Sequence, residues 1–305
     1  MRLLGRRSLR PRGIRDLSGR QVLVTGAGSG IGRAVAESAG RRGAILHLTD
    51  INATALARVA DAIRAGGGVV GTAEAVDVAD LDAVRRLARD VTQRYGSMDV
   101  VLNVAGTAVW GTVRGMEHDD WRRLVEINLM GPIHVIEEFV PPMVEARRGG
   151  QLVNVSSAAG IIGMPWHAAY SASKFGLRGV SEVLRFDLRR HGIGVTLVCP
   201  GAVDTGLVET IRIAGVDAQS RAFQRARAGF RRSAVSPERA ADAIWRGVRH
   251  NRYWVYTSAD IRLVHLLQRV CPPAYDLVMR ALNAGANRAL PAVEKARRSD
   301  LRERR

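Results

Sequence analysis

The chain is poor in lysine, in aromatic side chains and in cysteine. Of its 46 lysine and arginine residues, only Lys174 and Lys295 are lysines. Aromatic residues make up 5% of the chain, so its core must be built mainly from Ala, Val, Leu and Ile. The two cysteines, Cys199 and Cys271, fit no metal-ligand spacing and cannot form a disulfide framework. We therefore expect no metal site and a reducing, cytoplasmic setting.

Long hydrophobic runs are also absent. The sequence contains no run of 18 apolar residues, so we expect no helix that spans a membrane. Residues 1–15 carry the positive charges of a signal peptide without an apolar stretch behind them, so we expect no secretion signal. With 47% hydrophobic and 25% charged residues, the composition is that of a globular protein with a packed core.

The net charge of +17 is concentrated in three segments, residues 1–20, 212–232 and 288–305, which together account for 15 charges. These arginines are either a solvated face or a surface for peripheral contact with an anionic membrane. They lack interleaved aromatic residues and a known nucleic-acid motif, so we expect no nucleic-acid partner.

Short apolar runs alternate with helical patterns along most of the chain. Strands are predicted at residues 21–26, 44–50, 71–78, 98–106, 151–157 and 194–201, and helices at 30–43, 53–65, 80–95, 118–145 and around Tyr170 to about 191. This alternation predicts an α/β protein with a doubly wound parallel sheet, the Rossmann fold. We expect a basic tail at 1–17, a single domain at 18–258, and a helical extension with a basic tail at 259–305.

A glycine-rich loop, TGAGSGIG at residues 25–32, joins the first predicted strand to the first helix. Gly26, Gly30 and Gly32 would permit a tight turn and a close approach of a pyrophosphate to the main chain. The helix N-terminus would add free N–H groups and a positive dipole end. Such a loop between a strand and a helix predicts a dinucleotide site.

Asp50 ends the second predicted strand, 20 residues after Gly30. A carboxylate there accepts hydrogen bonds from ribose hydroxyls and repels a 2′-phosphate. Ser29 and Ile51, the obvious positions for a cation that would bind that phosphate, are uncharged. We therefore predict NAD as the cofactor, with NADP as the second choice; the alternative role of Asp50 is that of a turn residue or helix cap.

Lys174 follows Tyr170 by four residues in the motif YSASK. In a helix this spacing places the phenol and the ammonium on one face. A lysine kept where arginine is otherwise preferred indicates a role that a guanidinium cannot fill. The ammonium is expected to lower the pKa of the Tyr170 phenol for proton transfer, whereas the alternative is a chance surface pair.

Several motifs then stand in a recognisable order. They are the glycine loop, NVAG at 103–106, Asn128, Ser156 with Ser157, YSASK, and PGAVDT at 200–205. Over residues 18–258 the chain resembles the short-chain dehydrogenase/reductase family, with Val104 where many members have a second Asn. The resemblance implies an NAD(P)-dependent oxidoreductase that interconverts an alcohol and a carbonyl group.

The resemblance also implies the role of each catalytic residue. Tyr170 would be the general acid/base, and Ser157 would hydrogen-bond the same substrate oxygen, with Ser156 as a structural neighbour. Lys174 would hold the nicotinamide ribose and lower the pKa of Tyr170. Asn128 would support a water that connects Lys174 to solvent. The implied cofactor-binding residues are Gly26, Ser29, Gly30, Ile31, Gly32, Asp50, Ile51, Asp77, Val78, Asn103, Ala105, Gly106, Tyr170, Lys174, Pro200, Gly201, Val203 and Thr205.

The residues expected on the substrate side are mostly apolar. They are Trp110, Ile161, Ile162, Met164 and Trp166, together with the 206–235 segment expected to close over the substrate. This favours a hydrophobic secondary alcohol or ketone, such as a lipid, retinoid or steroid-like compound. Two alternatives are a reductase of an acyl-CoA or another anionic carrier-linked carbonyl, and an NAD-binding redox sensor without turnover. We assign no role to His167.

The extension has helical patterns at 260–270 and 274–285, separated by Pro272 and Pro273. It would cover the substrate crevice, join a subunit interface or lie on a membrane surface, unless it is a simple packed helix. We expect a homodimer or homotetramer.

Overall fold

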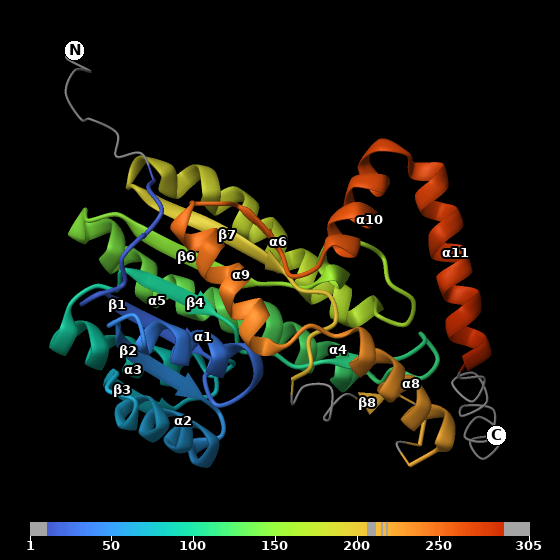
Figure 1. Cartoon of the computed structure of the whole chain (residues 1–305), viewed down its shortest axis with the longest axis horizontal. Coiled ribbons are helices and arrows are strands. Elements are labelled where there is room, and N and C mark those ends of the chain that lie inside the picture. Colours follow the sequence, from blue (N-terminus) through green and yellow to red (C-terminus); the bar gives the residue numbers. More distant parts are fainter. Residues whose placement is uncertain (1–10, 206–211, 215, 218, 290–305) are drawn as a thin grey trace.

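The computed structural model describes residues 11–205, 212–214, 216–217 and 219–289. Seven parallel strands form one sheet in the order β3-β2-β1-β4-β6-β7-β9 (Figure 1). The strands are β1 (Gln21–Thr25), β2 (Ile45–Asp50), β3 (Val69–Ala75), β4 (Val100–Asn103), β6 (Gly150–Val155), β7 (Ile193–Cys199) and β9 (Trp254–Tyr256). A small parallel pair, β5 (Val109–Trp110) and β8 (Arg212–Ile213), lies outside this sheet.

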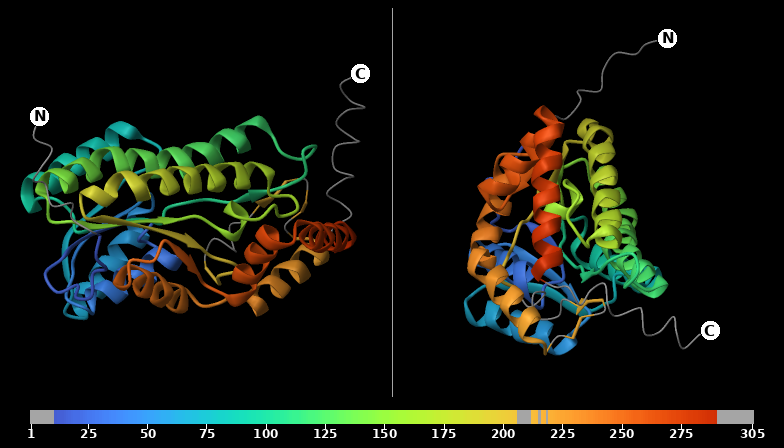
Figure 2. Two further views of the ribbon diagram at one scale, coloured as in Figure 1. Left: turned by 90° about the horizontal axis from the view of Figure 1, so that it is seen from above. Right: turned by 90° about the vertical axis from the view of Figure 1, so that its right-hand side faces the viewer.

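Helices cover both faces of the sheet (Figure 2). One layer contains α1 (Gly30–Gly40), α2 (Ala53–Ala65) and α9 (Pro237–Arg249), and the other contains α3 (Leu81–Tyr95), α5 (Gly131–Ala146) and α6 (Ala168–Asp187). Each layer buries its own apolar cluster against the sheet, around Val35 and Ile244 on one face and Leu87 and Phe139 on the other. The predicted doubly wound parallel sheet is confirmed.

The sheet is central, and its inner strands are largely apolar and buried. Every residue of β4 and β7 is buried, as expected for parallel strands with helices on both faces. The edge strand β3 is mostly exposed or half-buried instead. All seven strands are parallel, so their carboxyl ends, and the loops that follow them, gather at one end of the molecule.

Several boundaries differ from the predictions. The helix expected at 118–145 consists of α4 (His118–Val125), a π-helical turn (Glu126–Met130) and α5. Helix α9 and strand β9 were not predicted, although they complete one helical layer and one sheet edge. The basic stretches 1–10 and 290–305 and the segment 206–211 lie outside the described residues.

Residues 11–17, predicted as part of a tail, contact the domain. The Ile14 N–H donates to the carbonyl oxygen of Val248 at 3.2 Å. Asn251 donates through Nδ2 to the carbonyl of Pro11 at 3.2 Å, and Gln151 through Nε2 to that of Arg12 at 3.2 Å. These bonds attach the start of the described chain to the α9–β9 edge.

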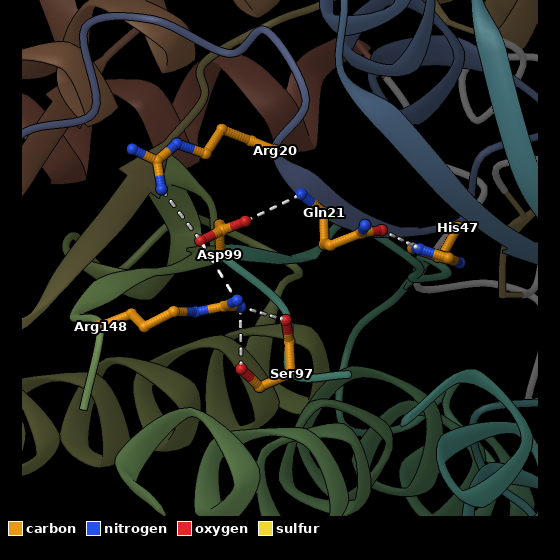
Figure 3. Close-up of polar contacts among 6 residues, drawn as sticks. All are labelled: Arg20, Gln21, His47, Ser97, Asp99 and Arg148. Carbon is orange, nitrogen blue, oxygen red and sulfur yellow. Dashed lines mark hydrogen bonds and ion pairs between the residues drawn. The ribbon is translucent and has the colours of Figure 1, made fainter. Parts of the chain in front are cut away.

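At the amino ends of the strands, a polar cluster around Asp99 joins three segments (Figure 3). The Asp99 carboxylate accepts from the Gln21 N–H at 2.9 Å and from Arg20 at 3.2 Å, and it pairs with Arg148 at 3.8 Å. The Gln21 side chain in turn contacts buried His47 at 2.7 Å. This cluster is structural, because it lies at the opposite end of the sheet from the strand C-termini.

The C-terminal extension forms a helical hairpin, α10 (Ala259–Val270) and α11 (Pro272–Ala289). Ile261 of α10 packs into an apolar cluster with Ile161 and Ile162. The Tyr275 hydroxyl of α11 accepts a hydrogen bond from the Gly163 N–H at 2.8 Å. The predicted extension is therefore present and packs on the loop after β6. Within the part of the chain that the structure describes, no helix has both the length and the apolar character needed to cross a membrane.

Candidate functional site

The glycine loop packs so closely that side chains are excluded at three positions. Gly26 and Gly30 have φ angles of +68° and +51°, which favour glycine. A Cβ atom on Gly32 would lie 2.0 Å from the carbonyl oxygen of Gly26, and one on Gly30 would lie 2.9 Å from the Thr205 side chain. Exposed Ser29 occupies the N-cap position of α1, and half-buried Ile31 packs on the core. The loop thus exposes main chain at a helix N-terminus, which suits a pyrophosphate.

Asp50 is held in place by the main chain on both sides of it. Its carboxylate accepts from the Gly28 N–H at 2.9 Å and from the Asn52 N–H at 2.8 Å. The neighbouring Ile51 is exposed, and Arg33 pairs with Glu37 of its own helix at 3.6 Å. The acidic group is therefore fixed beside the glycine loop, at the position expected for a ribose-binding carboxylate.

The loops after β3 and β4 form the next part of the site. Asp77 is exposed and accepts from the Ala79 N–H at 2.9 Å, whereas Val78 is buried. Ala105 donates its N–H to the Thr25 hydroxyl at 3.1 Å, which ties this loop to the glycine loop. Gly106 is exposed, and a Cβ atom there would lie 2.9 Å from the side-chain oxygen of Asn128.

The side chain of Asn103 lies inside the sheet. It donates through Nδ2 to Asn154 Oδ1 at 2.9 Å, and Asn154 donates to the Ser181 hydroxyl at 2.9 Å. All three residues are buried. Asn103 therefore connects β4 to β6 and α6 beneath the site, and only its main chain is available for the back wall expected from the sequence.

The loop after β7 closes the site from the other side. Pro200 accepts from the Ala158 N–H at 2.7 Å, and Gly201 donates to the Thr257 hydroxyl at 3.2 Å. Val203 is buried and forms a β-bridge with Val235. Thr205 lies against Gly30, so the loops after β1 and β7 meet at the start of α1.

Tyr170, Lys174 and Ser157 meet at the carboxyl ends of β6 and β7. The Lys174 ammonium lies 5.8 Å from the centre of the Tyr170 ring and donates to the carbonyl of Val155 at 3.1 Å. Ser157 Oγ accepts from the Ala159 N–H at 3.1 Å, and its hydroxyl also hydrogen-bonds the Tyr170 side chain. Ser156, its neighbour, donates to the main-chain carbonyl of Lys174 at 3.0 Å and so fixes α6 against β6.

Burial dominates the pKa values in this triad. Tyr170 and Lys174 are only 9% and 4% exposed. Desolvation raises the pKa of the Tyr170 phenol, and the Ser157 hydroxyl lowers it in part. Desolvation also lowers the pKa of the Lys174 ammonium to about 8. The lowered Tyr170 pKa expected from the sequence is thus not present in the chain alone, because the desolvation penalty exceeds the effect of the neighbouring groups.

Asn128 lies in the π-helical turn between α4 and α5, fully buried. Its side chain accepts from the Thr107 N–H at 2.9 Å and donates to the Thr107 carbonyl at 2.9 Å. It also donates to the Ser173 hydroxyl at 3.3 Å. Asn128 therefore positions the loop after β4 against α6, and the water link expected of it stays a prediction.

The substrate side of Tyr170 is apolar. A cluster of buried residues surrounds the Tyr170 ring, with half-buried side chains packed against it from Trp110, Met164 and Trp166. Ile161 and Ile162, expected in this wall, instead pack under the α10–α11 hairpin. A cavity of about 310 Å³ lies next to Met164, lined by Gly163, Met164, Pro165, Asp276, Met279, Arg280 and Asn283.

A short covering segment is anchored over this cluster. Strand β8 pairs with β5, and the Ala214 N–H donates to the Trp110 carbonyl at 2.7 Å. The Arg212 guanidinium forms an ion pair with the largely buried carboxylate of Asp120 in α4. Helix α8 (Arg221–Ser233) follows, and its Phe223 is buried in the Tyr170 cluster, whereas the Phe230 side chain lies outside the described residues.

Two residues near the candidate site, His167 and Asn154, were not anticipated from the sequence. His167 lies beside Trp110, with ring centres 4.5 Å apart, and 6.1 Å from the Tyr170 ring. Burial lowers its pKa, so it is neutral at physiological pH. The sequence did contain a signal for this position of His167, because a residue three positions before Tyr170 lies on the same face of a helix. Asn154 gave no signal, because it lies within an apolar strand.

The residues present fit a nicotinamide dinucleotide. The glycine loop exposes its main chain at the start of α1, Asp50 is fixed beside it, and the loops after β4 and β7 contact the same loop. These loops all follow the carboxyl ends of the strands, and the Tyr170–Lys174–Ser157 group lies at the same end of the sheet. Fold and site together define a dinucleotide-dependent oxidoreductase of the Rossmann class.

Comparisons with known proteins agree with this class. The family model described as short chain dehydrogenase matches residues 20–214. The putative oxidoreductase SadH of Mycobacterium tuberculosis is 34% identical over 271 residues, which cover 87% of this chain and 96% of SadH. A 3beta-hydroxysteroid dehydrogenase of Mediterraneibacter gnavus is 39% identical over 189 residues, covering 62% of this chain and 67% of that protein.

A solved structure shares the fold. It is a short-chain dehydrogenase/reductase from Burkholderia phymatum in complex with NAD, with a TM-score of 0.74 and 29% identity. The match covers 84% of this chain and 96% of that one. The chain belongs to the short-chain dehydrogenase/reductase family of oxidoreductases.

Proposed function

We propose that this protein interconverts a hydrophobic secondary alcohol and its ketone, with NAD(H) as the hydride carrier. The observation that carries the proposal is the meeting of Tyr170, Lys174 and Ser157 at the same end of the sheet as the glycine loop, among apolar side chains. When bound, the nicotinamide ring would accept or supply the hydride at the carbon that bears the substrate oxygen.

The side chains of the protein would handle the proton. In the reducing direction the Tyr170 hydroxyl donates its proton to the substrate oxygen, and in the oxidising direction the phenolate takes it back. Ser157, whose hydroxyl contacts the Tyr170 side chain, would donate a hydrogen bond to the same oxygen. Lys174, with a pKa of about 8, is mostly charged at neutral pH and stabilises the phenolate that Tyr170 becomes.

The apolar surroundings favour a substrate with a large hydrocarbon part. The walls next to Tyr170 come from Trp110, Met164 and Trp166, and Phe223 covers them. The Mediterraneibacter gnavus relative is a hydroxysteroid dehydrogenase, a function that acts on such a compound. We therefore place steroid-like and long-chain secondary alcohols first among the candidate substrates.

The test is cofactor-coupled turnover across a panel of secondary alcohols and ketones, with one acyl-CoA-linked ketone included. Tyr170→Phe should lower turnover by about a hundredfold or more while cofactor affinity stays unchanged, because the phenol acts on the substrate. Lys174→Arg should also be impaired, because a guanidinium differs in shape from an ammonium.

Tyr95→Phe is the matched control, since it removes a phenol that donates to the Gly71 carbonyl at 2.9 Å at the edge of the sheet. Near-normal turnover of Tyr170→Phe would overturn the proposal. Preference for the acyl-CoA-linked ketone would favour the anionic-carrier alternative. Tight cofactor binding without turnover on any compound would favour the redox-sensing alternative.

A further inference from the structure

Large apolar side chains are exposed on the outer face of the α10–α11 hairpin. Leu263, Leu266 and Val270 of α10 are 65%, 56% and 73% exposed. Their spacing of three and four residues places them on one face of the helix. Leu277, just after the turn into α11, is 70% exposed. A contiguous apolar face of this kind usually marks an interaction surface.

The hairpin is fixed to the domain by its opposite face. His265 is buried and contacts the Tyr256 hydroxyl through Nδ1 at 2.8 Å. Near the far end of α11, Asn287 accepts from the Trp166 indole N–H at 3.2 Å. The exposed leucines therefore do not result from a loose helix, because specific contacts hold the hairpin in this orientation.

A strongly basic helix lies at the same end of the molecule. Helix α8 contains five arginines and no acidic residue. Arg221, Arg225 and Arg232 are exposed and share the helix face opposite buried Phe223, so they point away from the domain. Figure 1 and the left view of Figure 2 place α8, α10 and α11 at the same end of the molecule.

Further arginines flank the apolar face itself. Arg262 and Arg269 of α10 are exposed on one side of the Leu263–Val270 row. At the surface of an anionic bilayer, charged headgroups lie outside the hydrocarbon chains. The apolar row would suit the hydrocarbon, and the bordering arginines and the basic outer face of α8 would suit the headgroups.

We propose that this end of the molecule docks on an anionic lipid membrane. Leu263, Leu266 and Val270 would insert among the lipids, while the outer arginines of α8 contact the headgroups. We favour an anionic membrane over a second copy of the chain, because a two-fold contact between two copies would bring two basic surfaces together. The hairpin also contacts Gly163 and Trp166 on the substrate side, so docking would place the substrate entrance next to the lipid.

Cys271 provides a direct probe of docking. It is exposed at the turn between α10 and α11, whereas Cys199, the other cysteine, is buried with a pKa raised to about 12. An environment-sensitive fluorophore on Cys271 should shift its emission to the blue when vesicles of phosphatidylglycerol and phosphatidylcholine are added at low salt. Pure phosphatidylcholine vesicles should produce a much smaller shift, and high salt should reverse it.

Two variants separate the apolar and the basic contributions in co-sedimentation with the same vesicles. They are Leu263→Ser with Leu266→Ser and Val270→Ser, and Arg221→Gln with Arg225→Gln and Arg232→Gln. Each should weaken vesicle binding tenfold or more, because insertion and headgroup attraction both contribute. Arg231 is left unchanged because it pairs with Asp204 at 3.0 Å.

Matched controls carry equivalent changes elsewhere. One neutralises the exposed arginines Arg58, Arg86 and Arg89 of α2 and α3, which gives the same change of net charge. The other replaces the exposed apolar residues Val69, Val183 and Phe186 of β3 and α6 by Ser. Both controls should bind vesicles like the unmodified protein.

Three results would overturn the proposal. The protein would fail to co-sediment with anionic vesicles, or the apolar variant would bind as well as the unmodified protein. In the third, the apolar variant would still bind vesicles, but sedimentation velocity would show that it no longer forms an oligomer that the unmodified protein forms. The apolar face would then be a subunit interface. The assays need no substrate, so they stand whether or not the proposed alcohol–ketone activity is found.

Discussion

At the scale of single residues, Lys174 is where burial and charge conflict most directly. Its ammonium is almost fully buried, and the contacts that the structure gives it are the Val155 carbonyl and the face of Tyr170. Taking a charge out of water is costly unless it is compensated. In the proposed mechanism this cost has a function, because a charged group beside Tyr170 would stabilise the phenolate during proton transfer.

We expect Lys174→Met to stabilise the cofactor-free protein at pH 7 by about 3 kcal/mol. Burial lowers the pKa of Lys174 from 10.5 to about 8, so the unfolded chain binds more protons between these two values. The stability contributed by Lys174 therefore rises with pH through this window, and the advantage of the methionine variant should shrink there. Urea unfolding at pH 7 and pH 10 measures the effect; an advantage that is equal at both pH values would contradict it.

Asp50 is the residue expected to set the choice of cofactor. NAD(H) should bind at least about tenfold more tightly than NADP(H), roughly 1.4 kcal/mol, because the fixed carboxylate repels a 2′-phosphate. Asp50→Ala with Ile51→Arg should narrow or reverse this preference. Fluorescence titration of both cofactors is the measurement, and equal affinities in the unmodified protein would show the expectation to be wrong.

At the scale of elements, the β5–β8 pair determines how the substrate pocket is covered. Strand β8 contributes Ile213 to the cluster around Tyr170, and among the described strands it pairs with β5 and not with the large sheet. The ion pair of Arg212 with Asp120 is thus a main attachment of this cover to α4.

Arg212→Gln should raise KM for the substrate severalfold, to about tenfold, with a smaller change in kcat. Loss of the ion pair frees the cover and also leaves the largely buried Asp120 carboxylate without its cation, which costs more than a surface pair would. Arg85→Gln is a matched control, because it removes an exposed ion pair with Asp82 and Glu138. A fall in kcat at constant KM would point instead to a role in the chemical step.

The sequence predicted the elements whose signals are local. The glycine loop lies between a strand and a helix, and Tyr170 and Lys174 are four residues apart on one helix, so their relation needs no tertiary information. The π-helical turn at Asn128 was missed because one inserted residue hardly alters a helical pattern. Helix α9 was not predicted, although it begins with an N-cap residue, Ser236, and a first-turn proline, Pro237. Strand β9 is only three residues long, which is too short to produce a recognisable strand pattern.

Part of the candidate site depends on contacts that no local pattern contains. Ile161 and Ile162 follow Ser157 closely, yet they turn away from the substrate because the α10 helix supplies Ile261 as a partner. The raised Tyr170 pKa likewise depends on how completely the surrounding elements exclude water. Both are properties of packing, which the sequence alone could not reveal.

At the scale of the whole molecule, the two ends of the domain are joined. Residues 11–14 contact β6 and the segment after α9, and a Cβ atom on Gly13 would lie 2.0 Å from the carbonyl oxygen of Arg249. This contact attaches the start of the described chain to the end of α9 and to the amino end of β6.

Deleting residues 1–13 should therefore lower the free energy of unfolding by about 1–3 kcal/mol, because the side-chain amides of Gln151 and Asn251 lose the carbonyl groups to which they donate. Deletion of residues 1–10, which leaves Pro11 and Arg12 in place, is the control and should have a smaller effect. Urea unfolding of the two truncated proteins decides the matter; equal stabilities would mean that the segment contributes nothing.

The strand order has a consequence for synthesis on the ribosome. Strand β1 lies in the middle of the sheet, but its two neighbours emerge at different times: Val22 pairs with Leu46 and with Val100. Until β4 has been made, the nascent β1–β2–β3 half-sheet presents β1 as an open apolar edge, a template for pairing with other chains. Helix α9, which covers this face, is made later still. A nascent chain that has not yet reached β4 would therefore expose an aggregation-prone edge, and we expect chaperone capture to be concentrated on its first hundred residues.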